Sequence, residues 1–113
     1  MNKSSLYKGC LEPIVLQLLQ TKRRMYGYEM TQLVKDLTKG ELQITEGALY
    51  PLLHRLEAQG LLTAEMELAD NRMRKYYSLT KAGKARTKNA LEELQVFLQT
   101  MGHLINLKLT SPC

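Results

Sequence analysis

Residues 46–57 constrain the fold most, because they carry an apolar face and a polar face at helical spacing. Leucines recur at intervals of three and four and predict the buried face: Leu49, Leu52, Leu53 and Leu56. The opposite face carries small residues, an aromatic ring and hydrogen-bond donors: Gly47, Tyr50, Pro51, His54 and Arg55. We expect Thr45 to cap this helix and its front to lie against a polar surface. Pro51 either kinks the helix or lies close enough to its start to cost little.

Two helices are predicted before this one. The first is capped by Ser4 or Ser5 and runs to about Gln20. Because Pro13 lies inside this stretch, the alternative is a later start, near Leu11 or Glu12, which places Pro13 in the first turn, where proline is tolerated. The second spans residues 27–37. We expect residues 21–24 to form a basic, solvated loop between them, with phosphate contact as the alternative. Residues 42–44 are expected to form a short extended piece before the third helix.

After the third helix the apolar pattern changes from helical spacing to alternation. Residues 62–68 and 73–79 alternate on both sides of an Asp-Asn turn, which predicts a β-hairpin. Because an isolated hairpin is marginally stable in water, this one is expected to pack on the helices. Of the two adjacent tyrosines we expect Tyr77 in the core and Tyr76 exposed.

A long last helix is predicted from its cap, Thr80, to residue 109. At about 28 residues it would be about 42 Å long, which exceeds what a domain of this size can cover. Its apolar positions step by three and four, as in helices that pair along a seam. We favour a second copy of the chain as the cover, with an interface at Leu91, Leu94, Phe97, Leu98, Met101 and Ile105. The alternative is that the seam folds back on the first helix of its own chain.

The order of three helices, a hairpin and a long helix is that of a winged helix-turn-helix, a mainly α (α+β) fold. Residues 1–80 would form the DNA-binding domain, residues 81–109 a dimerisation helix and residues 110–113 a loose tail. In this geometry the third helix enters the DNA major groove and the hairpin forms the wing.

Charge supports a polyanionic partner. The chain has 113 residues, which suits one domain, and a net charge of +5. Between residues 72 and 88 there is no acidic residue, and the basic residues are Arg72, Arg74, Lys75, Lys81, Lys84, Arg86 and Lys88. A solvated basic face is the alternative, but the neighbouring recognition-type helix favours double-stranded DNA.

Several classes of protein are not expected. No apolar run approaches the ~20 residues that span a bilayer, and the N-terminus lacks a signal-peptide pattern, so we expect a cytoplasmic protein with no membrane partner. Cys10 and Cys113 fit neither a metal nor a disulfide spacing. We expect Cys10 in the core and Cys113 as a loose thiol. His54 and Glu57 form a surface pair rather than a metal site, and no cofactor is predicted.

Three blocks of the sequence resemble the PadR family of bacterial transcriptional regulators. They are residues 26–30, residues 46–57 with the following Gly60-Leu61-Leu62, and residues 74–80 with Gly83. The blocks occur in the family's order and cover most of residues 11–84. The chain resembles the short subfamily, which has a single C-terminal helix.

The resemblance implies a homodimeric repressor of a palindromic operator, often released by a small aromatic or drug-like effector. It implies that the third helix and the wing face DNA, and we take the contacts to be Thr45, Gly47, Tyr50, His54, Arg55, Asn71, Arg72, Arg74 and Lys75. Residues 26–28 would support the helix-turn-helix. The alternative for Tyr50 is packing on the wing.

The sequence departs from the family pattern in two places. The family wing often carries glycine and further arginine where this chain has Asn71 and Met73; asparagine tolerates the left-handed conformation, so the turn is kept. Some short members stack flat drugs between tryptophans, whereas this chain has no Trp and has Leu94 in that part of the helix. An effector pocket would instead be apolar, with Phe97 and Met101 in its lining.

An enzyme is not expected, because the sequence offers no phosphate-binding glycine loop, no nucleophile with a base and no carboxylate pair in apolar surroundings. The alternative function is a winged-helix module that binds an acidic protein. Salt-sensitive, sequence-dependent binding to duplex DNA separates the two. RNA binding usually relies on exposed aromatic rings, and one Phe and no Trp argue against it.

Overall fold

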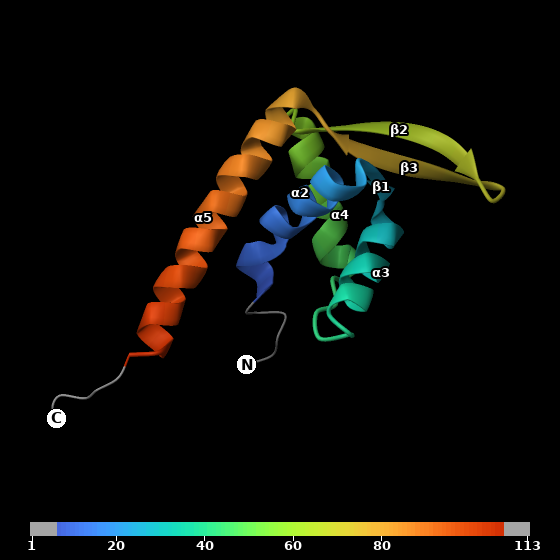
Figure 1. Ribbon diagram of the computed structural model, residues 1–113. Coiled ribbons are helices and arrows are strands. Elements are labelled where there is room, and N and C mark those ends of the chain that lie inside the picture. Colours follow the sequence, from blue (N-terminus) through green and yellow to red (C-terminus); the bar gives the residue numbers. More distant parts are fainter. Residues whose placement is uncertain (1–6, 108–113) are drawn as a thin grey trace, which may run out of the picture.

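The computed structural model describes residues 7–107, and its elements follow the expected order (Figure 1). After a short 3-10 turn, η1 (Lys8–Cys10), the described chain forms helices α2 (Leu11–Lys22), α3 (Gly27–Leu37), α4 (Glu46–Ala58) and α5 (Lys81–Ile105). The strands are β1 (Arg24–Tyr26), β2 (Leu62–Ala69) and β3 (Arg72–Leu79). This is the predicted winged helix-turn-helix, with a long helix at its end.

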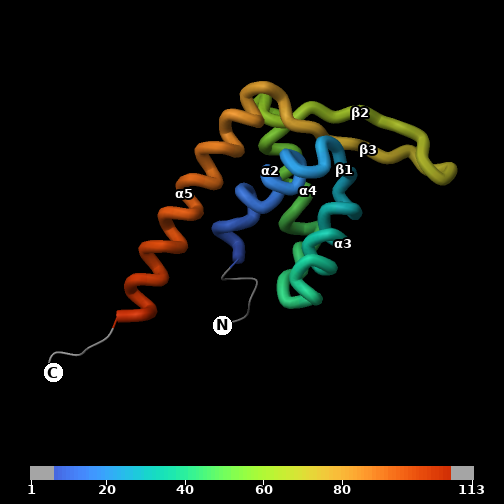
Figure 2. The backbone as a smooth tube through the Cα atoms, in the orientation of Figure 1, coloured from blue at the N-terminus to red at the C-terminus, as the bar shows by residue number. Residues whose placement is uncertain are grey.

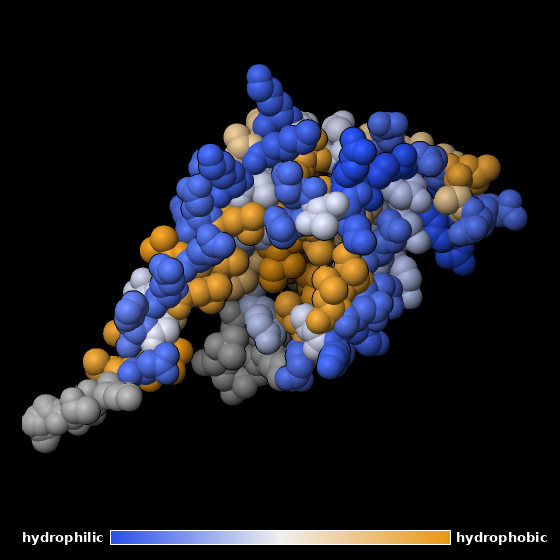
Figure 3. All heavy atoms as spheres, viewed as in Figure 1, coloured by the Kyte–Doolittle hydropathy of each residue, from blue (hydrophilic) through white to orange (hydrophobic). Residues whose placement is uncertain are grey.

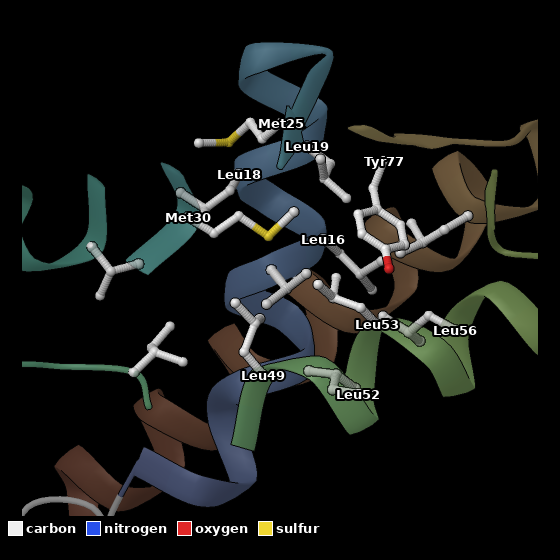
Figure 4. Close-up of a cluster of buried hydrophobic side chains, with 14 of the residues drawn as sticks. Leu16, Leu18, Leu19, Met25, Met30, Leu49, Leu52, Leu53, Leu56 and Tyr77 are labelled. Atoms are coloured by element: carbon white, nitrogen blue, oxygen red, sulfur yellow. The ribbon is translucent and has the colours of Figure 1, made fainter. Parts of the chain in front are cut away.

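One apolar core joins α2, α3, α4 and the inner end of the sheet (Figure 4). The predicted leucine face of α4 is buried in it, which confirms the pattern on which the third helix was predicted. Tyr77 is 1% exposed, and in Figure 4 its ring descends from β3 toward Leu53 and Leu56. Burying each such side chain stabilises the fold by about 1.5–3 kcal/mol.

Helix α2 begins at Leu11, the later of the two starts considered, so Pro13 lies in its first turn. Ser4 and Ser5 lie outside the described residues. It ends two residues later than predicted, at Lys22, where Arg23 adopts a positive φ of 72° and its N–H donates to the Leu19 carbonyl. Cys10 lies in η1 and is half-buried, so the expectation that it fills the core was wrong.

A turn organised by Thr38 connects α3 to α4. The Thr38 hydroxyl donates to the Val34 carbonyl at 2.8 Å and accepts from the Leu42 N–H at 3.0 Å. Leu42 and Ile44 then enter the core, which anchors the predicted extended piece without strand pairing. These contacts fix α4 relative to α3.

Helix α4 has the predicted start. The Thr45 hydroxyl accepts a hydrogen bond from the Ala48 N–H at 3.2 Å and caps the helix. Pro51 is accommodated inside α4, which continues beyond it to Ala58.

The sheet is antiparallel, with β3 between β1 and β2. The β2–β3 hairpin closes through a two-residue turn in which Asp70 and Asn71 have φ of 52° and 62°. Two consecutive left-handed residues match the twist of a tight hairpin, so Asn71 performs the role expected of it. Strand β1 was not predicted: Arg24 was assigned to a loop, but Met25 pairs with Tyr77 and is buried.

Helix α5 is capped by Thr80, whose hydroxyl accepts from the Gly83 N–H at 3.0 Å and donates to the Gly60 carbonyl at 2.7 Å. Figure 2 shows α5 and the β2–β3 hairpin leaving the helical body in different directions. The helix ends at Ile105 rather than at residue 109, with Asn106 N–H bonded to the Gly102 carbonyl. The predicted tail, with Cys113, lies outside the described residues.

Candidate nucleic-acid interface

The front of α4 and the inner part of the hairpin border one concave surface of about 590 Å³, which we call the groove. Its lining comes from β1, α3, α4 and β3: Tyr26, Gly27, Tyr28, Glu46, Tyr50, His54, Arg72, Met73, Arg74, Lys75 and Tyr77. Five of the predicted DNA-binding residues therefore meet here: Tyr50, His54, Arg72, Arg74 and Lys75.

Tyr50 lies at the meeting point of α4 and α3. Its ring and hydroxyl occupy the space over Gly27, where an added Cβ would come within 2.7 Å of the Tyr50 Oη. Burial raises the pKa of the Tyr50 phenol above its ordinary value of 10.0, so the hydroxyl remains a donor at neutral pH. Tyr50 thus packs on the start of α3 and also faces the groove.

The rest of the α4 front is open. His54 and Gly47 are exposed, as is the cap Thr45. The backbone near Gly47 is unobstructed, because no heavy atom lies within 4 Å of the position of a Cβ there. A flat or grooved partner can therefore approach α4 closely along this face.

Two arginines and two tyrosines form a stacked row along β1 and β3. The Arg24 Cζ lies 4.1 Å from the ring centroid of Tyr76, and the Arg74 Cζ lies 4.3 Å from that of Tyr26. The two rings meet edge to face with centroids 5.3 Å apart. Tyr76 is thus half-buried in this row rather than exposed. Each stack is worth about 0.5–1 kcal/mol near the surface, and the row fixes where Arg74 lies.

Arg74 is incompletely satisfied. Its Nε is buried and has no hydrogen-bond partner among the described residues. A buried N–H without an acceptor costs free energy, so the stack on Tyr26 holds the Arg74 guanidinium in place against this cost.

Two other cations of this region are paired with carboxylates. Lys75 Nζ lies 3.2 Å from Glu57 Oε1, and this hydrogen bond raises the pKa of the Lys75 ammonium above its ordinary value. Arg24 pairs with Glu67 of β2, and this hydrogen bond likewise raises the pKa of its guanidinium. Arg72, by contrast, is exposed at the start of β3.

Arg55 does not line the groove with the other predicted residues. It lies on the flank of α4 toward α2, where its Nη2 is 3.2 Å from Glu12 Oε1. Asn71 lies at the hairpin turn and is exposed, also outside the groove lining. The polar face predicted for α4 is therefore divided: Tyr50 and His54 line the groove, whereas Arg55 lies beside α2.

Sequence reasoning missed three residues of the groove: Glu46, Met73 and Tyr77, the last of which was expected only in the core. Arg24, next to the groove, was assigned to a solvated loop, with phosphate contact as the alternative. Glu46 stands in the first turn of α4, where acidic side chains are favoured. In β1 Arg24 is exposed, Met25 buried and Tyr26 half-buried, and three residues are too few for such an alternation to be recognised in the sequence.

The apolar face of α5 is covered along its first half only. Thr87 and Ala90 are buried in this half, which packs against α2. Leu91, Leu94 and Met101 are half-buried. The first half of α5 therefore packs on the helical body of its own chain.

The second half of α5 carries exposed apolar side chains. Phe97, Leu98 and Ile105 are 52%, 56% and 77% exposed. Figure 3 shows apolar residues along α5 beside a hollow that separates it from the helical body. An apolar pocket of about 310 Å³ lies between α2, α3 and α5, and its lining includes Ile14, Leu37, Leu91 and Leu94.

Within residues 7–107, no three His, Cys, Asp or Glu side chains are grouped so that they could hold a metal ion. No helix in the same range has the length and apolar character needed to cross a membrane.

Comparison with known families gives one matching model, described as the transcriptional regulator PadR-like family, over residues 15–89. A protein of Lysinibacillus sphaericus named uncharacterized protein X is 36% identical over 94 residues, which cover 82% of this chain and 85% of that protein. The transcriptional regulator Rv3488 of Mycobacterium tuberculosis is 45% identical over 65 residues, covering 55% of this chain and 61% of that protein.

Solved structures share the whole fold. A transcriptional regulator from Clostridium thermocellum superposes with a TM-score of 0.80 at 27% identity, over 93% of this chain and 100% of that one. A PadR family transcriptional regulator from Eggerthella lenta gives a TM-score of 0.73 at 34% identity, over 92% and 88% of the two chains.

Proposed function

The chain belongs to the PadR-like family of transcriptional regulators, and on this premise we propose that it is a homodimeric repressor of a palindromic operator. The observation that carries the proposal is the groove, in which the front of α4 meets the basic start of β3. Members of the family are transcription regulators rather than enzymes, in agreement with the expectation from the sequence.

In this proposal α4 enters the major groove. His54 and Tyr50 present ring nitrogens and a hydroxyl, which can bond base edges, while exposed Gly47 and the Thr45 cap allow the helix start to approach phosphate. The protonated phenol of Tyr50 is a donor at neutral pH. These residues would supply sequence preference.

The wing would supply most of the affinity. Arg72, Arg74 and Lys75 are close enough together to meet neighbouring phosphates, and each neutralised phosphate adds about 0.9 to the log–log salt slope. Asn71 forms the turn of the wing, and the alternative for the wing arginines is to enter the minor groove, which is read mainly by width.

The second half of α5 supports the homodimer. Phe97, Leu98 and Ile105 present a row of exposed apolar side chains, of the kind that marks a binding surface. A second copy is the occupant we propose, because a two-fold pair of such helices covers both rows with one self-complementary contact. The two copies of α4 would then address half-sites about one helical turn, roughly 34 Å, apart.

We propose that the dimer represses by covering a promoter and excluding polymerase. An effector would act by changing the distance or angle between the two copies of α4. The apolar pocket beside Leu91 and Leu94, with Phe97 and Met101 on the same helix, suits a small apolar or aromatic molecule. Without tryptophan in the chain, such a molecule would be held by aliphatic packing rather than by ring stacking between indoles.

The proposal is tested by replacing His54 or Tyr50 with alanine and measuring affinity for operator and for random duplex DNA. We expect the affinity for operator to fall by about fivefold to 150-fold, as for a lost base contact of about 1–3 kcal/mol, with a smaller loss on random DNA. Equal losses on both DNAs would make these residues backbone contacts. Binding to an acidic polypeptide in preference to DNA would favour a protein partner instead.

A further inference from the structure

One carboxylate connects three helices on the flank of the proposed DNA-binding face. Glu12, in the first turn of α2, accepts from Arg55 of α4 at 3.2 Å and from Arg86 of α5 at 2.9 Å. The Glu12 side chain is only 16% exposed, whereas those of Arg55 and Arg86 are about half exposed. The acid is therefore enclosed, and the two guanidinium groups reach it from the surface.

Each oxygen of the Glu12 carboxylate binds a different arginine. Arg55 Nη2 bonds Oε1, while both Nε and Nη2 of Arg86 bond Oε2. Hydrogen bonds between ionised groups are stronger than neutral ones, and a planar guanidinium holds a carboxylate in a defined orientation. The position of Arg55 is thus set by a residue from a helix that does not itself face the groove.

Arg55 could bind a DNA phosphate instead of Glu12. It stands on α4 one residue after His54, which lines the groove. An arginine at the edge of a recognition helix would bind any phosphate within reach, irrespective of sequence. Such a contact raises affinity for random DNA as much as for an operator, and so lowers discrimination.

We propose that Glu12 is a positioning residue of the DNA interface, which competes with DNA phosphate for Arg55 and thereby restrains sequence-independent binding. The inference rests on the proposed function. Arg86 of α5 binds the same carboxylate. Glu12 therefore also links α4 to α5, the helix proposed to dimerise.

The test is Glu12→Gln, which keeps the size of the side chain and removes its charge. We expect affinity for random duplex DNA to rise, the magnitude of the log–log salt slope to increase by about 0.9, and the ratio of operator to random affinity to fall. In an Arg55→Gln background the same substitution should leave the slope unchanged. Glu92→Gln is the matched control, since Glu92 is exposed on α5 and the substitution removes the same charge.

A purely structural role for Glu12 would lower thermal stability and leave the salt slope and the affinity ratio unchanged, and that result would overturn the inference alone. An equal rise in slope in the Arg55→Gln background would also overturn it, because the effect would then be one of net charge. If the wild-type chain bound no duplex DNA, the proposed function would fail first and the inference with it.

Discussion

The ring of Tyr50, on the helix proposed to read DNA, occupies the place of the missing side chain of Gly27 at the start of the preceding helix. The Tyr50 Oη, Cε1 and Cζ would all lie within 2.8 Å of a Cβ at Gly27. The glycine at the start of α3 therefore determines where the aromatic side chain of Tyr50 lies in the groove.

Gly27→Ala is expected to displace Tyr50 while preserving the fold. The displaced atoms are the far end of a side chain, and alanine is a better helix former than glycine by up to about 1 kcal/mol, so the free energy of unfolding should change by less than that. Affinity for operator should fall by about tenfold. Chemical denaturation and DNA titration measure the two quantities, and an unchanged operator affinity would contradict the role given to the Tyr50 ring.

Gly83→Ala is expected to destabilise the fold. A Cβ at Gly83 would lie 2.0 Å from the carbonyl oxygen of Leu61, which is backbone and cannot rotate away. The same oxygen accepts from the Thr80 N–H, so relieving the clash disturbs the start of α5. We expect a loss of about 1–3 kcal/mol in the free energy of unfolding, as for overpacking. Gly102→Ala, in open space on the same helix, is the control and should be neutral or stabilising.

Arg74→Ala and Lys75→Ala are each expected to weaken operator and random DNA alike. Both side chains line the groove and would bind phosphate, so each loss should lower the magnitude of the salt slope by about 1. Titrations at several salt concentrations measure the slope. Lys35→Ala, at the far end of α3, removes one exposed charge and should change it little. Unchanged affinity for both DNAs would refute the assignment of the wing.

Phe97→Asp and Leu98→Asp are expected to give folded monomers. Both positions are more than half exposed in the single chain, so helical content should be kept. In a dimer each carboxylate would be buried against apolar side chains, at a cost of about 2 kcal/mol or more, or roughly 30-fold in the dimer dissociation constant. Sedimentation distinguishes the two states. Gln99→Asp, on the opposite face of α5, should remain dimeric; if the Phe97 and Leu98 variants do so too, the interface lies elsewhere.

Periodicity accounts for what the sequence predicted well. The leucine face belongs to α4 alone, and the alternation around Asp70 and Asn71 belongs to two strands joined by a two-residue turn, so local spacing reveals both. The caps Thr45 and Thr80 are local in the same sense, since each hydroxyl accepts from an N–H three residues later. These signals gave the order of elements and hence the fold.

Contacts between distant residues could not be predicted in this way. Arg55 was placed on the front of its helix by spacing, but Glu12, which binds it, stands 43 residues earlier. Strand β1 forms because Met25 pairs with Tyr77 of β3, and no local sequence pattern predicts this pairing. Helix α5 was expected to be covered along its seam by a second copy of the chain, and its packing against α2 of the same chain is a contact between residues far apart in the sequence.

The most direct test of the account is to select bound duplexes from a random DNA pool at moderate salt and to sediment the resulting complex. The account predicts enrichment of an inverted repeat with half-sites about one helical turn apart, bound by two copies of the chain. Weak, uniform binding without enrichment, or binding of a single copy, would contradict the proposal of a dimeric operator-binding repressor.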